Sequence, residues 1–195
     1  METVMTAPRI ALMACLFLAA CANAPFVDTP VLPADTFANY PGVLAPMTID
    51  ESALDDAGIV LGNNGPRPVD PARAAHAVAS IEYLAGAMNT GAYWIGVDPL
   101  AAQLMILSRQ EIRQTLGAAP NARSQDVVNV MLAASRAQSP AGMAAALNSP
   151  VFPQGGQATY ERLAALDQLP ITRRAIPQAS RARYYLNKSP EFPVY

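Results

Sequence analysis

Apolar side chains recur every three or four residues in six segments after residue 70, which is the spacing of one face of an α-helix. Two segments begin at Asp70-Pro71 and Asp98-Pro99, where an aspartate can cap a helix and the missing N–H of proline costs nothing. The other four begin near Ser124, Pro140 and Thr159 and within residues 172–186. The pattern predicts an all-α fold, a small bundle of about five or six short helices after an extended N-terminal tether.

Three details of these elements are expected from the same pattern. The helix that begins at Pro99 is apolar on nearly every side at its start, which predicts a central position with Leu104 and Leu107 buried. The last helix contains Pro177, which is expected either in its first turn or at a kink. Before the helical region, the apolar run of residues 59–61 could form a short strand, although no partner strand is evident.

The composition suits one globular domain. The chain has 195 residues, of which 52% are hydrophobic and 14% charged, and its formal net charge is −2. Wholesale disorder is not expected, because disordered chains combine low hydrophobicity with high net charge. A nucleic-acid-binding protein is not expected either, since contact with many phosphates usually needs a strongly basic balance.

The N-terminus has the pattern of a secretory signal. Residues 10–20 form an unbroken apolar run of eleven residues, which is shorter than the roughly 20 needed to span a bilayer. The run fits the apolar core of a signal peptide, with Arg9 as the preceding positive charge. Glu2 weakens that charge, so the start of translation is left open between Met1 and Met5.

Leu18-Ala19-Ala20-Cys21 closes the apolar run and resembles the lipobox of bacterial lipoproteins. The resemblance covers residues 1–21 only. It implies cleavage after residue 20, attachment of a diacylglycerol to the Cys21 sulfur and acylation of the new amine, for example with palmitate. Two or more acyl chains anchor a protein stably to a membrane. Ala22 follows the cysteine where an aspartate would favour the inner membrane, so the same resemblance favours the outer membrane, with the domain facing the periplasm.

The resemblance divides the chain into three parts. Residues 1–20 are expected to be a cleaved signal peptide, residues 21–48 a lipidated proline-rich tether, and residues 49–195 a single α-helical domain with an extended C-terminal tail. The aromatic residues of the tether leave a second interpretation open, in which part of it packs against the domain: Phe26, Phe37 and Tyr40. With Cys21 alkylated, the mature chain has no thiol for a disulfide or a metal site.

No catalytic, cofactor-binding or metal-ligating residue is predicted. His76 is the only histidine, and no G-x-S-x-G elbow accompanies it, so it is expected at the surface or at the edge of the core. The acidic residues between 50 and 56 lack the spacing of a calcium loop and are expected to be solvated or to cap helices. The helical glutamates are expected on exposed faces: Glu82, Glu111 and Glu161.

The C-terminal helix is one candidate interaction surface, because it gathers arginines beside Tyr184 and Tyr185: Arg173, Arg174, Arg181 and Arg183. Arginine suits anionic partners, since its planar guanidinium binds phosphate or carboxylate through two hydrogen bonds. Arg174 and Arg181 are seven residues apart and share a face if Pro177 does not break the helix. The alternative is a solvated face with internal ion pairs.

Tyr93 and Trp94 are a second candidate, in a connection between two predicted helices. There they could contribute to an interface or simply close the end of the bundle.

These features predict a non-enzymatic, membrane-anchored envelope lipoprotein that binds a protein partner or an anionic lipid or polymer. A carrier of a small apolar ligand in the helical core is the first alternative, and a cryptic hydrolase is the second. A large apolar cavity would favour the carrier. Two carboxylates, or His76 and a serine, meeting in a cleft would favour the hydrolase. Neither a nucleic acid nor a cofactor is expected.

Overall fold

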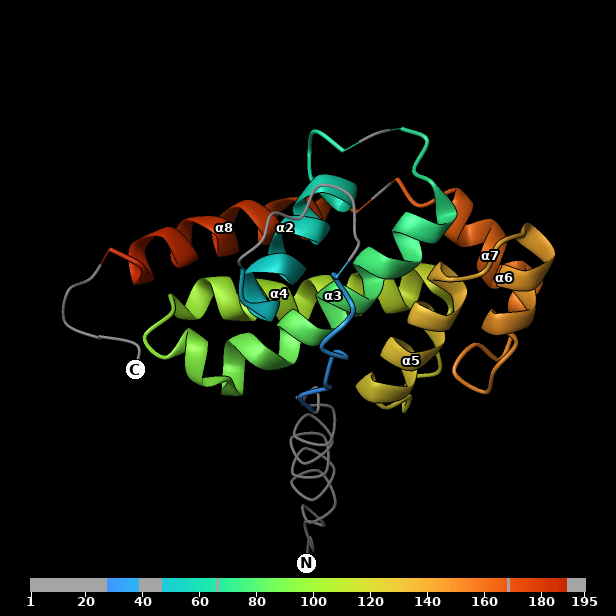
Figure 1. Ribbon diagram of the computed structural model, residues 1–195, viewed down its shortest axis with the longest axis horizontal. Helices are drawn as coiled ribbons and strands as arrows, with labels where there is room; N and C mark the ends of the chain where they lie inside the picture. The colour runs from blue at the N-terminus through green and yellow to red at the C-terminus, as the bar shows by residue number, and fades with distance from the viewer. Residues whose placement is uncertain (1–27, 39–46, 66, 168, 189–195) are drawn as a thin grey trace, which may run out of the picture.

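The computed structural model describes residues 28–38, 47–65, 67–167 and 169–188. These residues form helices and no strand, which confirms the predicted all-α bundle (Figure 1). The described helices are α2 (Ile49–Leu61), α3 (Pro71–Thr90), the 3-10 turn η2 (Ala92–Trp94), α4 (Pro99–Leu116), α5 (Ser124–Ser135), α6 (Pro140–Leu147), α7 (Gly156–Ala164) and α8 (Pro170–Leu186).

The predicted signal peptide, Cys21 and the last seven residues lie outside the described residues. Among the helices that the structure describes, none combines the length and the apolar composition needed to cross a bilayer.

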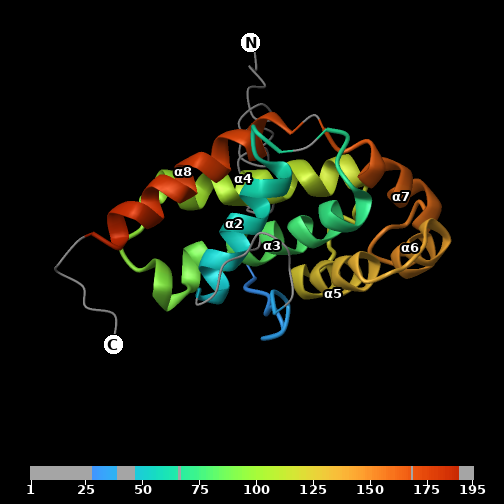
Figure 2. The same ribbon diagram turned by 45° about the horizontal axis from the view of Figure 1, so that its top comes forward.

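Helix α3 is the central element of the bundle. It packs against α2, α4 and α5, while α8 lies along α4 and also touches α2 (Figure 2). Helices α6 and α7 pack on each other beside α5 at one end of the molecule (Figure 1). Fully buried side chains of α3, such as Ile81 and Leu84, therefore join those of several other helices, such as Met105 and Met131, in one core.

The predicted capping signals position several helix starts. Asp70 accepts a hydrogen bond from the Arg73 N–H at 2.9 Å, and Asp98 accepts one from the Leu100 N–H at 3.0 Å. Helix α8 begins differently, because the carboxylate of Glu111 in α4 accepts the N–H groups of Ile171 at 2.9 Å and Thr172 at 2.8 Å. Glu111 thus caps a neighbouring helix rather than lying free on an exposed face.

The strand suggested at residues 59–61 is wrong, because these residues form the last turn of α2. The helix begins upstream at a capping box, in which Thr48 and Glu51 each accept a hydrogen bond from the other's backbone N–H. Val60 and Leu61 face the core, whereas Ile59 is partly exposed, which is a helical and not an alternating arrangement.

The predicted burial of Leu104 and Leu107 is met only in part, since both are partly buried and Leu104 packs against the edge of the core. The stripe that faces the core lies on the neighbouring side of α4: Ala101, Met105, Ser108, Ile112 and Leu116. An apolar segment does not say which of its sides neighbouring helices will cover. Here α3 and α8 pack against α4 and leave Leu100, which is 56% exposed, at the surface.

Pro177 lies inside α8, and the helix continues past it to Leu186. The condition for placing Arg174 and Arg181 on one face is therefore met.

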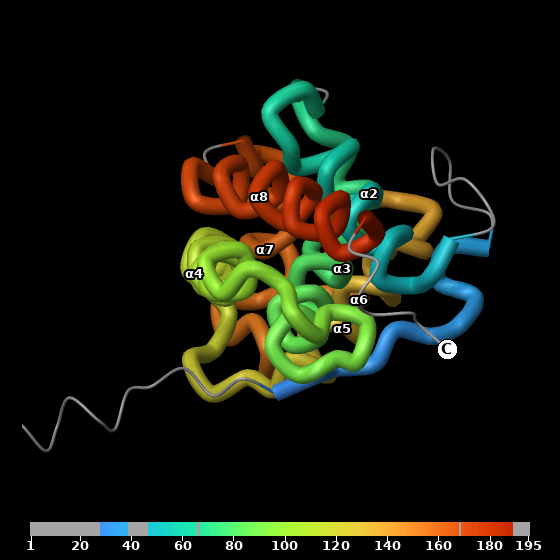
Figure 3. Tube along the Cα trace, turned by 90° about the vertical axis from the view of Figure 1, so that its left-hand side faces the viewer, coloured from blue at the N-terminus to red at the C-terminus, as the bar shows by residue number. Residues whose placement is uncertain are grey.

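Residues 28–38, the described part of the predicted tether, lie against α3 and α5 (Figure 3). Leu32 is buried in the core, and the backbone of this segment crosses α3 at Gly86. For these eleven residues the structure agrees with the interpretation in which part of the tether packs against the domain.

The orientation of α4 predicts a contrast between two of its apolar side chains. Met105→Ala is expected to lower the free energy of unfolding by about 2–5 kcal/mol, because it opens a cavity in a closed core. Leu100→Ala is expected to change it by less than about 0.5 kcal/mol. Denaturant unfolding followed by far-UV circular dichroism measures both values, and equal losses at the two positions would contradict this orientation.

Candidate functional site

Five side chains of α8 and its end form an exposed basic and aromatic surface, here called the α8 surface: Arg174, Arg181, Tyr184, Tyr185 and Lys188. Helical spacing places all five on one side of α8. Arg174 and Arg181 make no hydrogen bond or ion pair with other described residues. The ammonium group of Lys188 lies 4.4 Å from the centre of the Tyr184 ring. The two arginines are thus available to an external anion.

The other two predicted arginines make internal contacts. Arg183 forms an ion pair with Asp55 of α2 at 2.9 Å, and Arg173 donates a hydrogen bond to the Asp167 carbonyl. These contacts hold α8 in place, which is the internal ion-pairing role that the sequence also allowed. The predicted basic cluster therefore divides into two exposed and two structural arginines.

Exposed apolar side chains also lie near the start of α4, where Asp98 accepts a hydrogen bond from Gln178 of α8 at 2.8 Å. Ile95 and Leu100 are exposed there, and a shallow hollow of about 380 Å³ between the two segments is lined by residues that include Asp98, Arg181 and Tyr185. Exposed tyrosine and arginine beside apolar side chains are typical of protein–protein interfaces.

Tyr93 and Trp94 belong to η2 at the end of α3. Trp94 is buried, its indole N–H donates to the Asp50 carboxylate at 2.7 Å, and its ring meets that of Tyr93 edge-on at 5.0 Å. Tyr83 donates to the same Asp50 oxygen at 3.1 Å. Trp94 therefore closes the end of the core and does not line an open surface.

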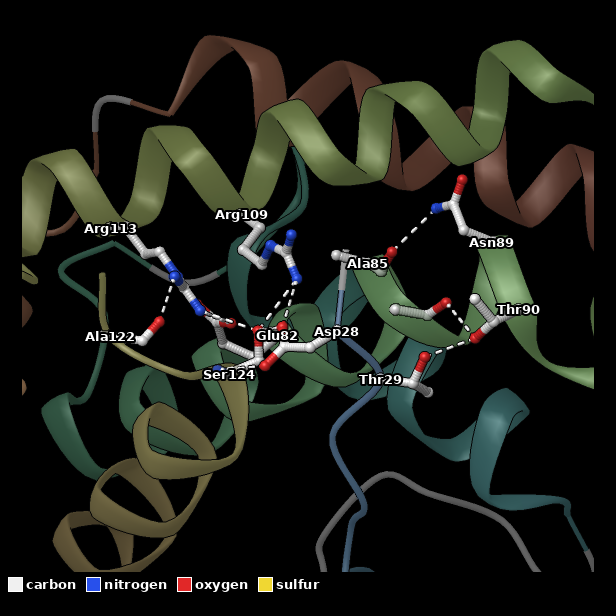
Figure 4. A network of polar contacts seen from close by, with 11 residues as sticks. Asp28, Thr29, Glu82, Ala85, Asn89, Thr90, Arg109, Arg113, Ala122 and Ser124 are labelled. Atoms are coloured by element: carbon white, nitrogen blue, oxygen red, sulfur yellow. Dashed lines mark hydrogen bonds and ion pairs between the residues drawn. The ribbon is translucent and has the colours of Figure 1, made fainter. Parts of the chain in front are cut away.

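A buried network of charges joins α3, α4 and α5 (Figure 4). Glu82 of α3 is only 1% exposed, and its two carboxylate oxygens accept hydrogen bonds from Arg113 of α4 at 2.7 and 2.8 Å. Arg109, one turn earlier in α4, donates to the Ser124 hydroxyl at 3.1 Å and lies 3.5 Å from Asp28. Each acid thus faces a guanidinium group, as buried charges require.

The electrostatic balance differs between the members of this network. Partial burial raises the pKa of Asp28, but the hydrogen bonds from Ser124 and the charge of Arg109 outweigh this effect, so the pKa is lowered. Burial opposes the charge of Arg113, but the hydrogen bonds and charge of Glu82 outweigh it and raise the pKa of Arg113. The contacts of the Asp28 carboxylate therefore stabilise the fold at neutral pH, and this contribution is lost as the pH falls through the lowered pKa.

A cleft of about 810 Å³ opens beside the network, between the end of α4 and the α4–α5 connection. Its lining combines the charged or polar side chains of Asp28, Arg109, Arg113, Asn121 and Arg123 with apolar surface from alanine and proline residues of the connection. A cleft with charged walls differs from the apolar cavity that a carrier of an apolar ligand would need.

His76 is buried, which corrects its expected place at the surface or at the edge of the core. Its Nδ1 lies 2.9 Å from an Asp56 carboxylate oxygen, and its Nε2 lies 3.2 Å from the Thr36 carbonyl. Ser80 donates to the same Asp56 oxygen at 2.6 Å. In a hydrolytic triad the histidine stands between the serine and the acid. Here the acid lies between the serine and the histidine, which is not the order of a hydrolytic triad. The cluster instead links the 28–38 segment, through the Thr36 carbonyl, to His76 of α3 and Asp56 of α2.

Within the described ranges, no three histidine, cysteine, aspartate or glutamate side chains gather as a metal site would require.

The sequence reasoning missed the charge network because it placed Glu82 on an exposed face. One signal was available, since Glu82 lies within the apolar stripe of α3 between Ile81 and Leu84. A comparison with known proteins finds no family model, curated protein or solved structure that matches this chain.

The charge network predicts a strong coupling between Glu82 and Arg113. Arg113→Met is expected to lower the free energy of unfolding by about 3–5 kcal/mol, because Glu82 is left buried without its partner. The double variant Glu82→Leu/Arg113→Met is expected to recover much of this loss, since neither charge remains.

Denaturant unfolding of the wild type, both single variants and the double variant measures this coupling. Arg123→Met, a change of an exposed arginine at the same cleft, serves as the control and should stay within about 0.5 kcal/mol of the wild type. Additive losses in the double variant would contradict the coupling.

Proposed function

We propose that this protein is a non-enzymatic lipoprotein of the bacterial envelope, anchored through Cys21, whose helical domain binds an acidic protein partner through the α8 surface. The observation that carries the proposal is the exposure of Arg174 and Arg181 on one face of an unbroken helix, beside Tyr184 and Tyr185. These residue types supply both anion recognition and much of the binding energy in protein interfaces.

The position of Asp28 supports a fixed orientation of the domain toward the membrane. Asp28 is held by Ser124 and Arg109, and it follows Cys21 by seven residues. Seven extended residues reach at most about 25 Å. A lipid on Cys21 would therefore keep the Asp28 side of the domain close to the bilayer.

The α8 surface lies on the other side of the domain. The beginning of the 28–38 segment and α8 are on opposite sides of α4 in two views (Figures 1 and 3). In the proposed orientation the α8 surface faces away from the anchoring membrane, which favours a periplasmic protein over the headgroups of that membrane. The exposed Ile95 and Leu100 near the start of α4, a segment that contacts α8 through Asp98 and Gln178, favour a protein over a simple polyanion.

The anchor predicts a defined labelling result. Cys21→Ala is expected to abolish labelling of the protein by an alkynyl fatty acid in cells, because the acceptor sulfur is lost and processing stops. The variant should accumulate as an uncleaved precursor or as protein released from the membrane. Cys15→Ala, as the control, should be labelled like the wild type, and persistent labelling of Cys21→Ala would contradict the anchor.

The α8 surface predicts a charge-dependent contact with a partner. A photo-crosslinking residue at Tyr184 is expected to give a discrete adduct in cells, whereas the same residue at Gln103, on an exposed part of α4, gives none. Arg174→Glu/Arg181→Glu should reduce the adduct at least tenfold, because two attractive contacts become repulsive. Arg123→Glu/Arg136→Glu makes the same change of net charge elsewhere and should leave the adduct intact.

The contact is further distinguished from lipid binding by flotation of the non-acylated domain with vesicles. Equal flotation with neutral and anionic vesicles is expected if the partner is a protein. Flotation with anionic vesicles that is lost at high salt would replace the protein partner with an anionic membrane. An adduct that survives Arg174→Glu/Arg181→Glu would contradict the proposed surface.

A further inference from the structure

Residues 28–32 lie in a groove formed by α3 and α5, here called the α3–α5 groove and defined by Gly86, Thr90, Arg109, Ser124 and Gln125. The segment alternates along its length. Pro30 and Leu32 are buried against the domain, while Thr29 and Val31 are exposed. Alternation of buried and exposed side chains is the pattern of an extended peptide bound along a surface.

The side-chain amide of Gln125 binds the backbone of this segment. Its side-chain oxygen accepts the Val31 N–H at 2.7 Å, and its side-chain nitrogen donates to the Val31 carbonyl at 3.1 Å. The Val31 side chain itself is 68% exposed. A single amide thus satisfies both polar backbone groups of one residue without regard to its side chain, as the edge of a β-sheet does for an added strand.

The groove has a socket for a carboxylate at one end. The Asp28 carboxylate accepts hydrogen bonds from the Ser124 N–H at 2.9 Å and from the Ser124 hydroxyl, and it lies 3.5 Å from Arg109. Arg109 is itself only 3% exposed. A buried guanidinium beside the first N–H groups of α5 makes this end selective for a negative charge.

Gly86 sets how closely a chain can approach α3. A Cβ atom at this position would lie 2.6 Å from the Asp28 carbonyl oxygen and 2.7 Å from the Thr29 Cα. Those are backbone atoms, so no side-chain rotation could relieve the overlap. The groove is therefore shaped for a peptide backbone in direct contact with the helix.

We propose that the α3–α5 groove is a peptide-docking site for an extended acidic segment of a partner protein, with the pattern carboxylate, any residue, proline, any residue, leucine, and that residues 28–32 are its resident intramolecular ligand. Three independent features define the ligand: the Gln125 clamp requires an exposed backbone, the socket requires a carboxylate, and the two buried positions require apolar side chains. The partner segment binds when it displaces the resident copy.

The resident copy competes by its attachment to the same chain. A segment joined to its site by a short linker has an effective concentration in the millimolar range. A free peptide therefore binds weakly to the wild-type chain and well to a chain whose own segment is impaired. This site is separate from the α8 surface, so it does not depend on the partner proposed there. Displacement of residues 28–32 would release the orientation that the Asp28 contacts give the anchored domain.

The test uses the mature chain from residue 21, made without lipid by Cys21→Ser, and a fluorescent peptide with the sequence of residues 28–38. Asp28→Lys/Leu32→Asp is introduced in the chain to impair the resident segment while leaving every groove residue unchanged. Fluorescence anisotropy is expected to show at least tenfold tighter peptide binding to this opened variant than to the wild-type chain. No difference between the peptide and a scrambled peptide would overturn the proposal.

Further variants test the groove in the opened chain. Gln125→Ala is expected to weaken peptide binding at least tenfold, and Gly86→Ala should abolish it. Gly58→Ala is the matched control, because a Cβ there meets only the Ile176 Cγ2 at an ordinary 3.6 Å. Both glycines lie inside helices, so alanine raises helix propensity at each and neither change is expected to unfold the chain.

Changes in the peptide test the predicted ligand pattern. A peptide in which lysine replaces the exposed valine should bind within about threefold of the original, whereas asparagine in place of the aspartate should weaken binding at least tenfold. Equal binding of the aspartate and asparagine peptides would overturn the carboxylate requirement.

If the opened variant does not fold, Asp28→Asn alone replaces it in the same measurements. Amide hydrogen exchange then adds a readout: the Val31 N–H, which donates to Gln125, should exchange at least tenfold faster in Gly86→Ala than in Gly58→Ala, with the centre of α3 protected in both. Release of the segment without binding of the added peptide would reduce the groove to a packing contact and overturn the proposal.

Discussion

The buried ion pair between Glu82 and Arg113 is the contact on which the arrangement of α3, α4 and α5 depends. The carboxylate of Glu82 lies in the middle of a core helix and therefore needs a cation nearby. Arg113 supplies it, which requires that this turn of α4 pack directly against Glu82. Arg113 uses its remaining donors on the Ala122 carbonyl and the Ser124 hydroxyl, at 2.9 Å each. The same side chain therefore fixes where α4 lies and where α5 begins.

The groove for residues 28–32 is a consequence of this arrangement. Once Arg113 has placed the first residue of α5, the N–H and hydroxyl of Ser124 and the guanidinium of Arg109 converge on one point, and the Asp28 carboxylate occupies it. At the other end of the 28–38 segment, the buried pair of Asp56 and His76 holds the Thr36 carbonyl. Polar contacts at both ends, with few buried apolar side chains between them, suit a segment that can be exchanged.

The two sides of α4 have different roles. The side of α4 toward α3 holds the compensated charges of Arg109 and Arg113, whereas α8, which packs against α4, carries the exposed Arg174, Arg181 and tyrosines. Ion pairs such as Arg183 with Asp55 use part of the basic cluster to attach α8, which leaves a smaller and better defined surface than the count of arginines suggests. Whether an arginine of α8 is paired or exposed depends on how close an acidic residue of another helix lies. That distance is set by the packing of helices that are far apart in the sequence, such as α2 and α8.

The sequence by itself determined the helical class and the helix starts at Asp70 and Asp98, because caps and apolar periodicity act over one or two turns. It also carried the possible lipid site at Cys21 and the face shared by Arg174 and Arg181, which a local helix is enough to define. Only the tertiary structure decided that α4 buries Met105 rather than Leu104, that His76 meets Asp56, and that Glu82 lies in the core opposite Arg113. These outcomes depend on which side of each helix its neighbours cover, and no local pattern contains that information.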